Sequence, residues 1–274
     1  MTESITSDSV RFYRPPLMPG VELVSVRYRE RSFPNHSHSE YVIGAIVAGA
    51  ERLTVAGRSY RVDTGNVLLL HPDEAHANAT IGFDVLRYDV LYLREDTMAS
   101  YVDRDRNNGV LRFALPVSGD PTLLAIVSAT HAALSCDAAG RLEQESALGA
   151  LVRALDVEGP GIPDMAGSQT VLAAHIADAK AYIDENYADG FGLHDLAALS
   201  GLSVFHFTRT FKKAIGLSPL AYRNQRRVTE ARVRLLEGQA IAQVALDMGY
   251  ADQSHLTRQF QRIVGASPRR YAQQ

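Results

Sequence analysis

The chain has 274 residues, of which 46% are hydrophobic and 22% charged, with a formal net charge of -3. This is the composition of a folded globular protein, and it excludes an intrinsically disordered chain. The single cysteine, Cys136, cannot form a disulfide within the chain, which favours a reducing compartment. No apolar run approaches the roughly 20 residues that a membrane span needs, and the polar N-terminus has no secretory signal, so we expect a cytoplasmic protein without membrane contact.

The charge is unevenly distributed along the chain. From residue 201 to the C-terminus, 12 Lys and Arg stand against 4 Asp and Glu, while the rest of the chain is acidic. This division indicates that the C-terminal part contacts an anionic partner. Chance variation of surface charge explains the same numbers equally well.

The first part of the chain alternates between apolar and polar residues, as short strands do. Strand-like runs occupy residues 21–28, 41–47, 67–70 and 83–93, and turn residues separate them. Short strands with turns about every ten residues predict an antiparallel sandwich or barrel.

Helical spacing of apolar residues begins near residue 120. It predicts two helices over about 121–156, broken near 137–140, which either cap the barrel or form a dimer interface. Residues 157–168 are rich in Gly and Pro and lack periodicity, which indicates a linker. Everything after it is expected to be helical.

An internal repeat at an offset of 49 residues is the strongest signal in the chain. Residues 206–222 match 255–271 in register, including the pairs Thr208-Arg209 and Thr257-Arg258. Each copy predicts a helix, a tight turn at Gly201 or Gly249, and a second helix with Ser203 or Asp252 as its N-cap. A long helix from Pro219 to about Leu236 is expected between the copies.

The second helix of each copy has an apolar face and an exposed polar face. Such a helix fits the DNA major groove, where Arg binds guanine edges and Thr contacts bases or thymine methyl groups. We expect base contacts from Phe205, Thr208, Arg209, Gln253, Ser254, Thr257 and Arg258. Phosphate contacts are expected from Lys212, Lys213, Arg226, Arg227, Arg262, Arg269 and Arg270. A helical bundle with solvated charged faces is the alternative, which two copies in register disfavour.

Two stretches carry a family resemblance: Gly249-Tyr-Ala-Asp-Gln-Ser-His-Leu-Thr-Arg-Gln-Phe260 and Gly265-Ala-Ser-Pro-Arg-Arg-Tyr271. They resemble the signature of the AraC/XylS family of bacterial transcription regulators. The resemblance covers about the last 100 residues, and the N-terminal half is similar, through weaker motifs, to the family's cupin sensor domain. It implies a dimeric, effector-responsive regulator that binds double-stranded promoter DNA. The first recognition helix departs from the family with Phe205 and His206, so its base preferences do not carry over.

The expected fold class is therefore multidomain, β then α. We expect an antiparallel cupin-like β-barrel with two attached helices over residues 1–158, a linker over 159–168, and an all-α DNA-binding domain with two helix-turn-helix units over 169–274. The expected partners are promoter DNA, an effector of unknown identity, a second copy of the chain and, for an activator, RNA polymerase.

No enzymatic activity is expected, because the chain contains no Ser-His-Asp order, phosphate-binding glycine loop or Cys-x-x-Cys motif. A cupin enzyme fused to a DNA-binding module is one rival interpretation, but a catalytic cupin has no need of two basic helix-turn-helix copies. An architectural DNA binder without an effector is another, and it leaves the barrel unexplained.

Histidines stand out in the barrel segment. On a strand, His36, His38 and Glu40 would share one face, and a later run brings His76 near a strand end. Two His at i, i+2 with a distant His is the arrangement by which cupin barrels hold a divalent metal. The carboxylate that cupins place four or five residues after the second His is missing, since Val42 and Ile43 stand there.

Three interpretations of these histidines stay open. They are structural residues, polar contacts to an organic effector, or ligands of a divalent metal in a metal-responsive regulator, with His36, His38 and His76 as the ligands. Our hypothesis is an effector pocket lined by His36, His38, Glu40 and His76, with Arg87 and Tyr88 as neighbours.

Overall fold

The computed structural model describes residues 8–82, 85–102, 111–156 and 171–273, so the predicted linker at 159–168 lies outside the described residues. The chain divides into two compact units, residues 1–32 with 38–163 and residues 33–37 with 164–274. By backbone pairing, residues 33–36 are part of strand β3, which belongs to a sheet of the first unit. None of the described helices is long and apolar enough to span a membrane.

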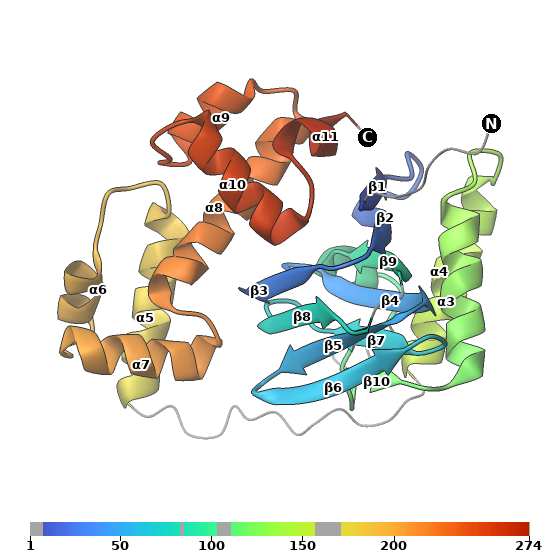
Figure 1. The fold of residues 1–274 in the computed structure, drawn as a ribbon, viewed down its shortest axis with the longest axis horizontal. Helices are drawn as coiled ribbons and strands as arrows, with labels where there is room; N and C mark the ends of the chain where they lie inside the picture. The colour runs from blue at the N-terminus through green and yellow to red at the C-terminus, as the bar shows by residue number, and fades with distance from the viewer. Residues whose placement is uncertain (1–7, 83–84, 103–110, 157–170, 274) are drawn as a thin grey trace. The chain divides into compact units, whose positions relative to one another are not determined.

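Two antiparallel sheets form the first unit (Figure 1). The larger sheet has the strand order β1 (Ser9–Tyr13), β2 (Val21–Tyr28), β9 (Leu86–Leu93), β4 (Tyr41–Ala48), β7 (Val67–Leu70) and β10 (Val117–Ser118). The smaller sheet has the order β3 (Ser32–His36), β8 (His76–Thr80), β5 (Ala50–Val55) and β6 (Arg58–Asp63). This arrangement confirms the predicted antiparallel, cupin-like fold class.

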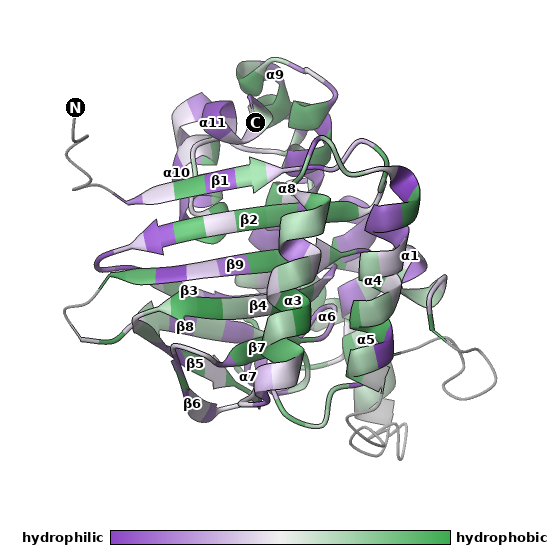
Figure 2. Cartoon of the chain, turned by 90° about the vertical axis from the view of Figure 1, so that its right-hand side faces the viewer, coloured by the Kyte–Doolittle hydropathy of each residue, from purple (hydrophilic) through white to green (hydrophobic). Residues whose placement is uncertain are grey.

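One face of the larger sheet packs against two helices, α3 (Pro121–Leu134) and α4 (Arg141–Asp156). Ile43 and Leu91 of the sheet join Val127 and Leu151 of the helices in one buried cluster. Side chains alternate along a strand, so the residues next to Ile43 and Leu91 face the smaller sheet instead. Figure 2 shows α3 lying across the strands. Both predicted helices and the break between them are confirmed, and a short helix, α1 (Glu95–Ala99), follows β9.

Helices form the described part of the second unit beyond residue 170. They are α5 (Val171–Asn186), α6 (Leu193–Leu199), α7 (Val204–Ile215), α8 (Pro219–Leu236), α9 (Ile241–Asp247), α10 (Gln253–Val264) and α11 (Pro268–Ala272). The pairs α6–α7 and α9–α10 are the two predicted helix-turn-helix units, and α8 connects them. Gly249 in the second turn has a φ of +72°, and a Cβ there would lie 2.2 Å from the carbonyl oxygen of Ala188, so only glycine fits.

The recognition helices, which are the second helices of the two units, α7 and α10, begin with the predicted caps. The side chain of Ser203 accepts a hydrogen bond from the backbone of α7, and Asp252 does the same for α10. The C-terminal ends match as well, since Gly216 and Gly265 adopt the left-handed conformation with φ of 82° and 83°. The repeat therefore specifies two structurally equivalent helices.

Candidate functional site

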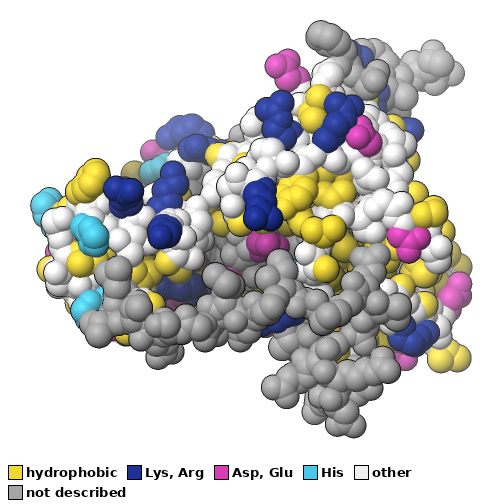
Figure 3. All heavy atoms as spheres, turned by 90° about the horizontal axis from the view of Figure 1, so that it is seen from below, with side chains coloured by type: hydrophobic (Ala, Val, Ile, Leu, Met, Phe, Trp, Pro, Cys, Tyr) yellow, Lys and Arg dark blue, Asp and Glu magenta, His cyan; other side chains and the backbone are white. Residues whose placement is uncertain are grey.

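The recognition helices α7 and α10 are anchored in the same way. Phe207 and Phe211 of α7 are fully buried, as are Leu256 and Phe260 of α10. The opposite faces present the residues predicted to contact bases: Phe205, Arg209, Gln253, Ser254 and Arg258 are exposed, and Thr208 and Thr257 are half-buried. On the face drawn in Figure 3, Lys and Arg side chains gather over the helices of the second unit, at the left.

The two threonines of the recognition helices adopt the same conformation. The hydroxyl of Thr208 donates a hydrogen bond to the carbonyl of Val204 at 2.8 Å, and the hydroxyl of Thr257 donates to the carbonyl of Gln253 at 2.8 Å. Each hydroxyl hydrogen is thus committed to its own helix. The threonine still offers a neighbour its methyl group, which suits contact with a thymine methyl, and an oxygen that can accept a hydrogen bond.

The residues predicted to contact phosphates fall into two groups. Lys212, Lys213, Arg262 and Arg269 are exposed, and Arg270 is half-buried. Arg226 is engaged within the unit, because its guanidinium forms ion pairs with Asp184 at 3.0 Å and with Glu230 at 3.3 Å. Its positive charge is therefore largely balanced by carboxylates of its own unit.

Arg227 does not lie where the sequence predicts. It is 8% exposed, and its guanidinium donates hydrogen bonds to the carbonyl oxygens of Tyr187 at 2.6 Å, Gly249 at 2.9 Å and Ala188 at 3.3 Å. The guanidinium also lies over the ring of Tyr250. With its donors used in this way, Arg227 binds the end of α5 and the second turn to α8, and we withdraw it from the phosphate contacts.

A second polar network, which the sequence patterns missed, joins α8 to the second helix-turn-helix unit. The hydroxyl of Tyr250 donates to the side chain of Asn224 at 2.7 Å, and the amide of Asn224 donates to Gln259 at 3.1 Å. Gln259 is part of α10, so these contacts link that helix to α8. The repeat offset predicts that α7 and α10 are equivalent, but it carries no information about this link between α8 and α10.

The predicted histidine cluster does form. His36, His38 and His76 each offer one ring nitrogen, and these atoms all lie within 4.8 Å of one another. Nδ1 of His36 lies 2.8 Å from the carbonyl of Pro34, and Nδ1 of His76 lies 2.9 Å from the carbonyl of Glu74. A carbonyl only accepts, so each Nδ1 carries the hydrogen and each Nε2 keeps its lone pair. Burial lowers the pKa of His36, which favours the neutral, ligating form.

This geometry fits a divalent metal. Neutral imidazoles whose second nitrogen bonds a backbone carbonyl are the usual ligands of zinc and similar ions. The same three rings suit hydrogen bonds to an organic molecule. The ring of His38 also packs against Tyr92, with centroids 5.0 Å apart.

Two residues predicted near this cluster lie elsewhere. Strand β3 ends at His36, so Glu40 does not share a strand face with the histidines, and it is absent from the ligand cluster found among the described residues. Arg87 is exposed, and as the neighbour of Tyr88 on β9 it points to the opposite face of the sheet. Of Arg87 and Tyr88, only Tyr88 faces the barrel interior.

The barrel interior holds an acid that the sequence patterns missed. Glu51 of β5 is 1% exposed; its Oε2 accepts a hydrogen bond from Asn78 at 3.0 Å, and its Oε1 has no partner among the described residues. Burial raises the pKa of Glu51 to about 7. Burial and the charges of Tyr28 and Glu51 also raise the pKa of Tyr88. On β5 the apolar residues at positions 53 and 55 share the inward face with Glu51. An acidic residue in line with inward-facing apolar residues is the sequence signal that could have identified this position.

Comparisons with known proteins match both units. A helix-turn-helix domain model covers residues 196–274, and the model of the AraC-like ligand binding domain covers residues 18–155. The HTH-type transcriptional regulator YbfI of Bacillus subtilis is 28% identical over 248 residues, or 88% of each chain. The MmsAB operon regulatory protein of Pseudomonas aeruginosa is 28% identical over 261 residues, or 90% of this chain and 80% of that protein.

Among solved structures, ToxT from Vibrio cholerae O395 has a similar fold. The match covers 92% of this chain and 97% of ToxT, with a TM-score of 0.57 and 12% identity. Two helix-turn-helix units joined by one helix, together with a ligand-binding β-domain, define a DNA-binding transcription regulator. The chain belongs to the AraC family of these regulators.

Proposed function

We propose that this regulator inserts α7 and α10 into successive major grooves of promoter DNA. The equivalence of the two helices carries the proposal: each exposes an arginine next to a threonine whose hydroxyl is bonded back to the helix. Arginine recognises guanine edges, and the threonine methyl suits thymine. We assign the base contacts to Phe205, Thr208, Arg209, Gln253, Ser254, Thr257 and Arg258.

The phosphate contacts belong to basic residues at the ends of these helices and after them. Phosphate contacts orient a protein on the duplex without recognising its sequence. Our set is Lys212, Lys213, Arg262, Arg269 and Arg270, with Arg226 contributing less because Asp184 and Glu230 already pair with it.

The test compares a base contact with a phosphate contact in the second unit. We expect Arg258→Ala to cost about 1–3 kcal/mol on the specific site and to relax the preference at one base pair. Arg269→Ala is expected to weaken binding to all sequences and to reduce the salt slope by about 1. Fluorescence anisotropy with a duplex that carries the specific site and with a scrambled duplex, over a salt series, measures both. Equal losses on the two duplexes for both variants would contradict the assignment.

A small molecule in the barrel of the first unit is the proposed effector. The histidine cluster supports this site, since three ring nitrogens within 4.8 Å lie beside Tyr92. An organic effector held by His36, His38 and His76, with Tyr88 nearby, is our first candidate. A divalent metal on the same nitrogens is the second, and the Nδ1 bonds of His36 and His76 favour it. The effector acts by favouring one arrangement of the two units over another.

We further propose a cytoplasmic homodimer without enzymatic activity, which contacts RNA polymerase if it activates transcription. The family resemblance implies the dimer, and α3 and α4 are its proposed interface.

A further inference from the structure

The carboxyl group of Glu51 is a buried acid that the proposed DNA and effector contacts leave unused. Glu51 is 1% exposed, and its Oε2 accepts a hydrogen bond from the side-chain amide of Asn78 at 3.0 Å. Its Oε1 is buried as well and has no hydrogen-bond partner among the described residues. Buried polar atoms in folded proteins are almost always hydrogen-bonded, so the unpaired oxygen points to a partner that the chain itself does not supply.

The strand register shows which side chains surround this oxygen. Glu51 of β5 lies directly opposite Thr80 of β8, and Leu53 of β5 lies opposite Asn78. Directly opposite residues of antiparallel strands project to the same face of a sheet. His76 is two residues before Asn78 on β8, so it shares that face. Glu51 therefore belongs to one inward row of the smaller sheet, which ends at the histidine cluster.

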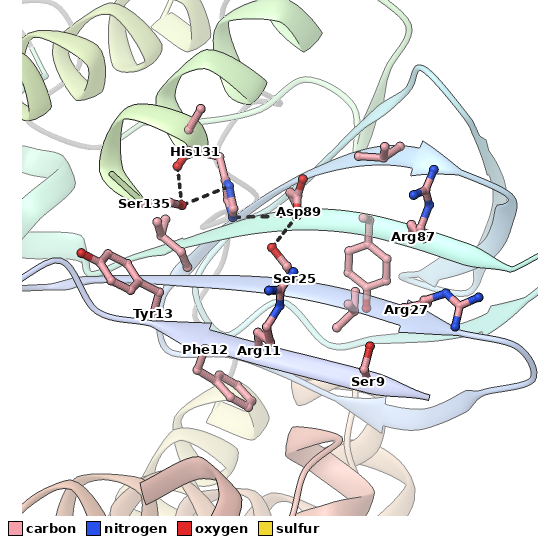
Figure 4. A pocket seen from close by; sticks show the side chains of 15 residues that line it. Ser9, Arg11, Phe12, Tyr13, Ser25, Arg27, Arg87, Asp89, His131 and Ser135 are labelled. Carbon is pink, nitrogen blue, oxygen red and sulfur yellow. Dashed lines mark hydrogen bonds and ion pairs between the residues drawn. The ribbon is translucent and has the colours of Figure 1, made fainter. Parts of the chain in front are cut away.

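The larger sheet supplies the opposite wall. Arg87 and Asp89 of β9 lie on its helix-covered face, where Asp89 is 4.0 Å from His131 of α3 (Figure 4). Tyr88 stands between them in the sequence and therefore projects into the barrel. Its phenol lies within electrostatic reach of Glu51, because the charge of Glu51 contributes to raising the pKa of Tyr88.

The space between the two sheets is open to a ligand at this level. Asn78 and Tyr88 are half-buried although both project inward, so solvent reaches them between the sheets. The inward positions of β5 that follow Glu51 are apolar, because Leu53 and Val55 occupy them. Among the described residues no Lys or Arg forms an ion pair with Glu51. A ligand that enters here therefore meets one unpaired acidic group on a mostly apolar wall.

We propose that the effector of this regulator is an amine, whose ammonium group donates a hydrogen bond to Oε1 of Glu51 and whose body lies between the sheets along Asn78 and Tyr88. An ammonium group fits this position better than a hydroxyl group does, because it brings both the missing donor and the positive charge that a buried carboxylate needs. This inference rests on the proposed effector site in the barrel and narrows the chemical class of its occupant.

The experiment is isothermal titration of the full-length chain with pairs of probes, in which an amine and an alcohol share one carbon skeleton. The pairs are benzylamine with benzyl alcohol, tyramine with tyrosol, and butane-1,4-diamine with butane-1,4-diol. The titrations are made near pH 8, above the pKa of about 7 that burial gives Glu51, so that the carboxyl is ionised while the amines stay protonated. We expect at least one amine to bind at least about tenfold more tightly than its alcohol, since a charge-assisted hydrogen bond replaces a neutral one.

Two variants at position 51 test whether this carboxylate causes the preference. Glu51→Gln keeps an oxygen but removes the charge, and Glu51→Met removes both in a side chain of similar length. Each is expected to weaken amine binding at least about tenfold and to leave the affinity for the alcohol unchanged. Glu143→Gln, at an exposed position of α4, is the matched control and keeps the preference. Circular dichroism confirms that each variant is folded.

A separate variant, His36→Ala, distinguishes failure of this inference from failure of the effector site itself. The inference is overturned if no amine binds, if amines bind no more tightly than their alcohols, or if Glu51→Gln and Glu51→Met keep the preference. The proposed effector site survives that result if an alcohol or Zn²⁺ still binds the parent and loses affinity in His36→Ala. Both fail together if no probe and no Zn²⁺ binds.

Discussion

Glu51 is a buried acid whose surroundings disfavour its charged form. One oxygen accepts a hydrogen bond from Asn78, and burial raises the pKa of Glu51 from 4.5 to about 7. In the unfolded chain this carboxyl ionises near its ordinary value, so between pH 4.5 and about 7 the unfolded state binds fewer protons than the folded state. The folded state therefore loses stability as the pH rises through this window, and the loss is complete above it.

We expect Glu51→Gln to remove this loss. Glutamine keeps an oxygen that can accept from Asn78 and has no charge to bury. Near pH 8 the variant should be more stable than the parent by up to about 3 kcal/mol, at about 1.4 kcal/mol per pKa unit, and near pH 4 the difference should largely vanish. Urea unfolding across this pH range measures it, with the exposed Glu143→Gln as control. The assignment is wrong if the parent and Glu51→Gln show the same pH dependence.

At the scale of elements, α8 is more than a spacer between the recognition helices. Arg227 bonds the carbonyls that follow α5 and the carbonyl of Gly249 in the second turn. Asn224, one turn earlier on α8, connects through its side chain to Tyr250 and Gln259. Because these contacts run from one helix to the end of α5 and to the second helix-turn-helix unit, they hold α10 against α8 and the end of α5.

Neighbouring arginines of α8 provide a matched test. Arg227→Lys keeps the charge but loses the planar fork of donors, leaving buried carbonyls unpaired, so we expect a loss of about 2 kcal/mol in the free energy of unfolding. Arg226→Lys alters partly exposed ion pairs and should cost less than about 1 kcal/mol. Urea unfolding followed by circular dichroism compares the two. If they cost the same, the carbonyl contacts of Arg227 contribute little.

At the scale of the whole molecule, the regulator separates its chemistry between two units. The proposed effector site lies in a β-domain, and the proposed DNA contacts lie on the helices of a basic domain. Coupling between such sites is limited by the effector's preference for one arrangement of the units, commonly 1–3 kcal/mol. We therefore expect a change in the barrel to alter the response to the effector without altering the contacts to DNA.

We expect the double variant His36→Ala, His76→Ala to lose the effector response while keeping its basal affinity for DNA. The measurement is the thermal unfolding of the full chain with a metabolite panel and with Zn²⁺, each with and without a chelator. A ligand at 100 times its dissociation constant stabilises the protein by about 2.7 kcal/mol, and this shift should vanish in the double variant. His194→Ala, an exposed histidine of the other unit, is the control. A shift that survives the double substitution would put the ligand elsewhere.

Local patterns predicted much of this architecture. The strands at residues 21–28 and 67–70, the two helices after residue 120, and the caps Ser203 and Asp252 all follow from periodicity and from turn and cap residues close together in the chain. The repeat specified both helix-turn-helix units, because equal spacing of apolar residues places equal faces in the core. These features depend on neighbours within a few residues, which is why the sequence by itself determined them.

The tertiary structure alone decided which side chains are free to act. Arg226 and Arg227 look alike in the sequence, yet only Arg227 is buried against backbone carbonyls. Its partners Tyr187 and Gly249 lie 40 and 22 residues away along the chain, so only the folded structure brings them to it. The burial of Glu51 and the meeting of His36 with His76 likewise require strands distant in sequence to pair. Burial and long-range contacts arise when separate segments pack together, and no local pattern encodes that packing.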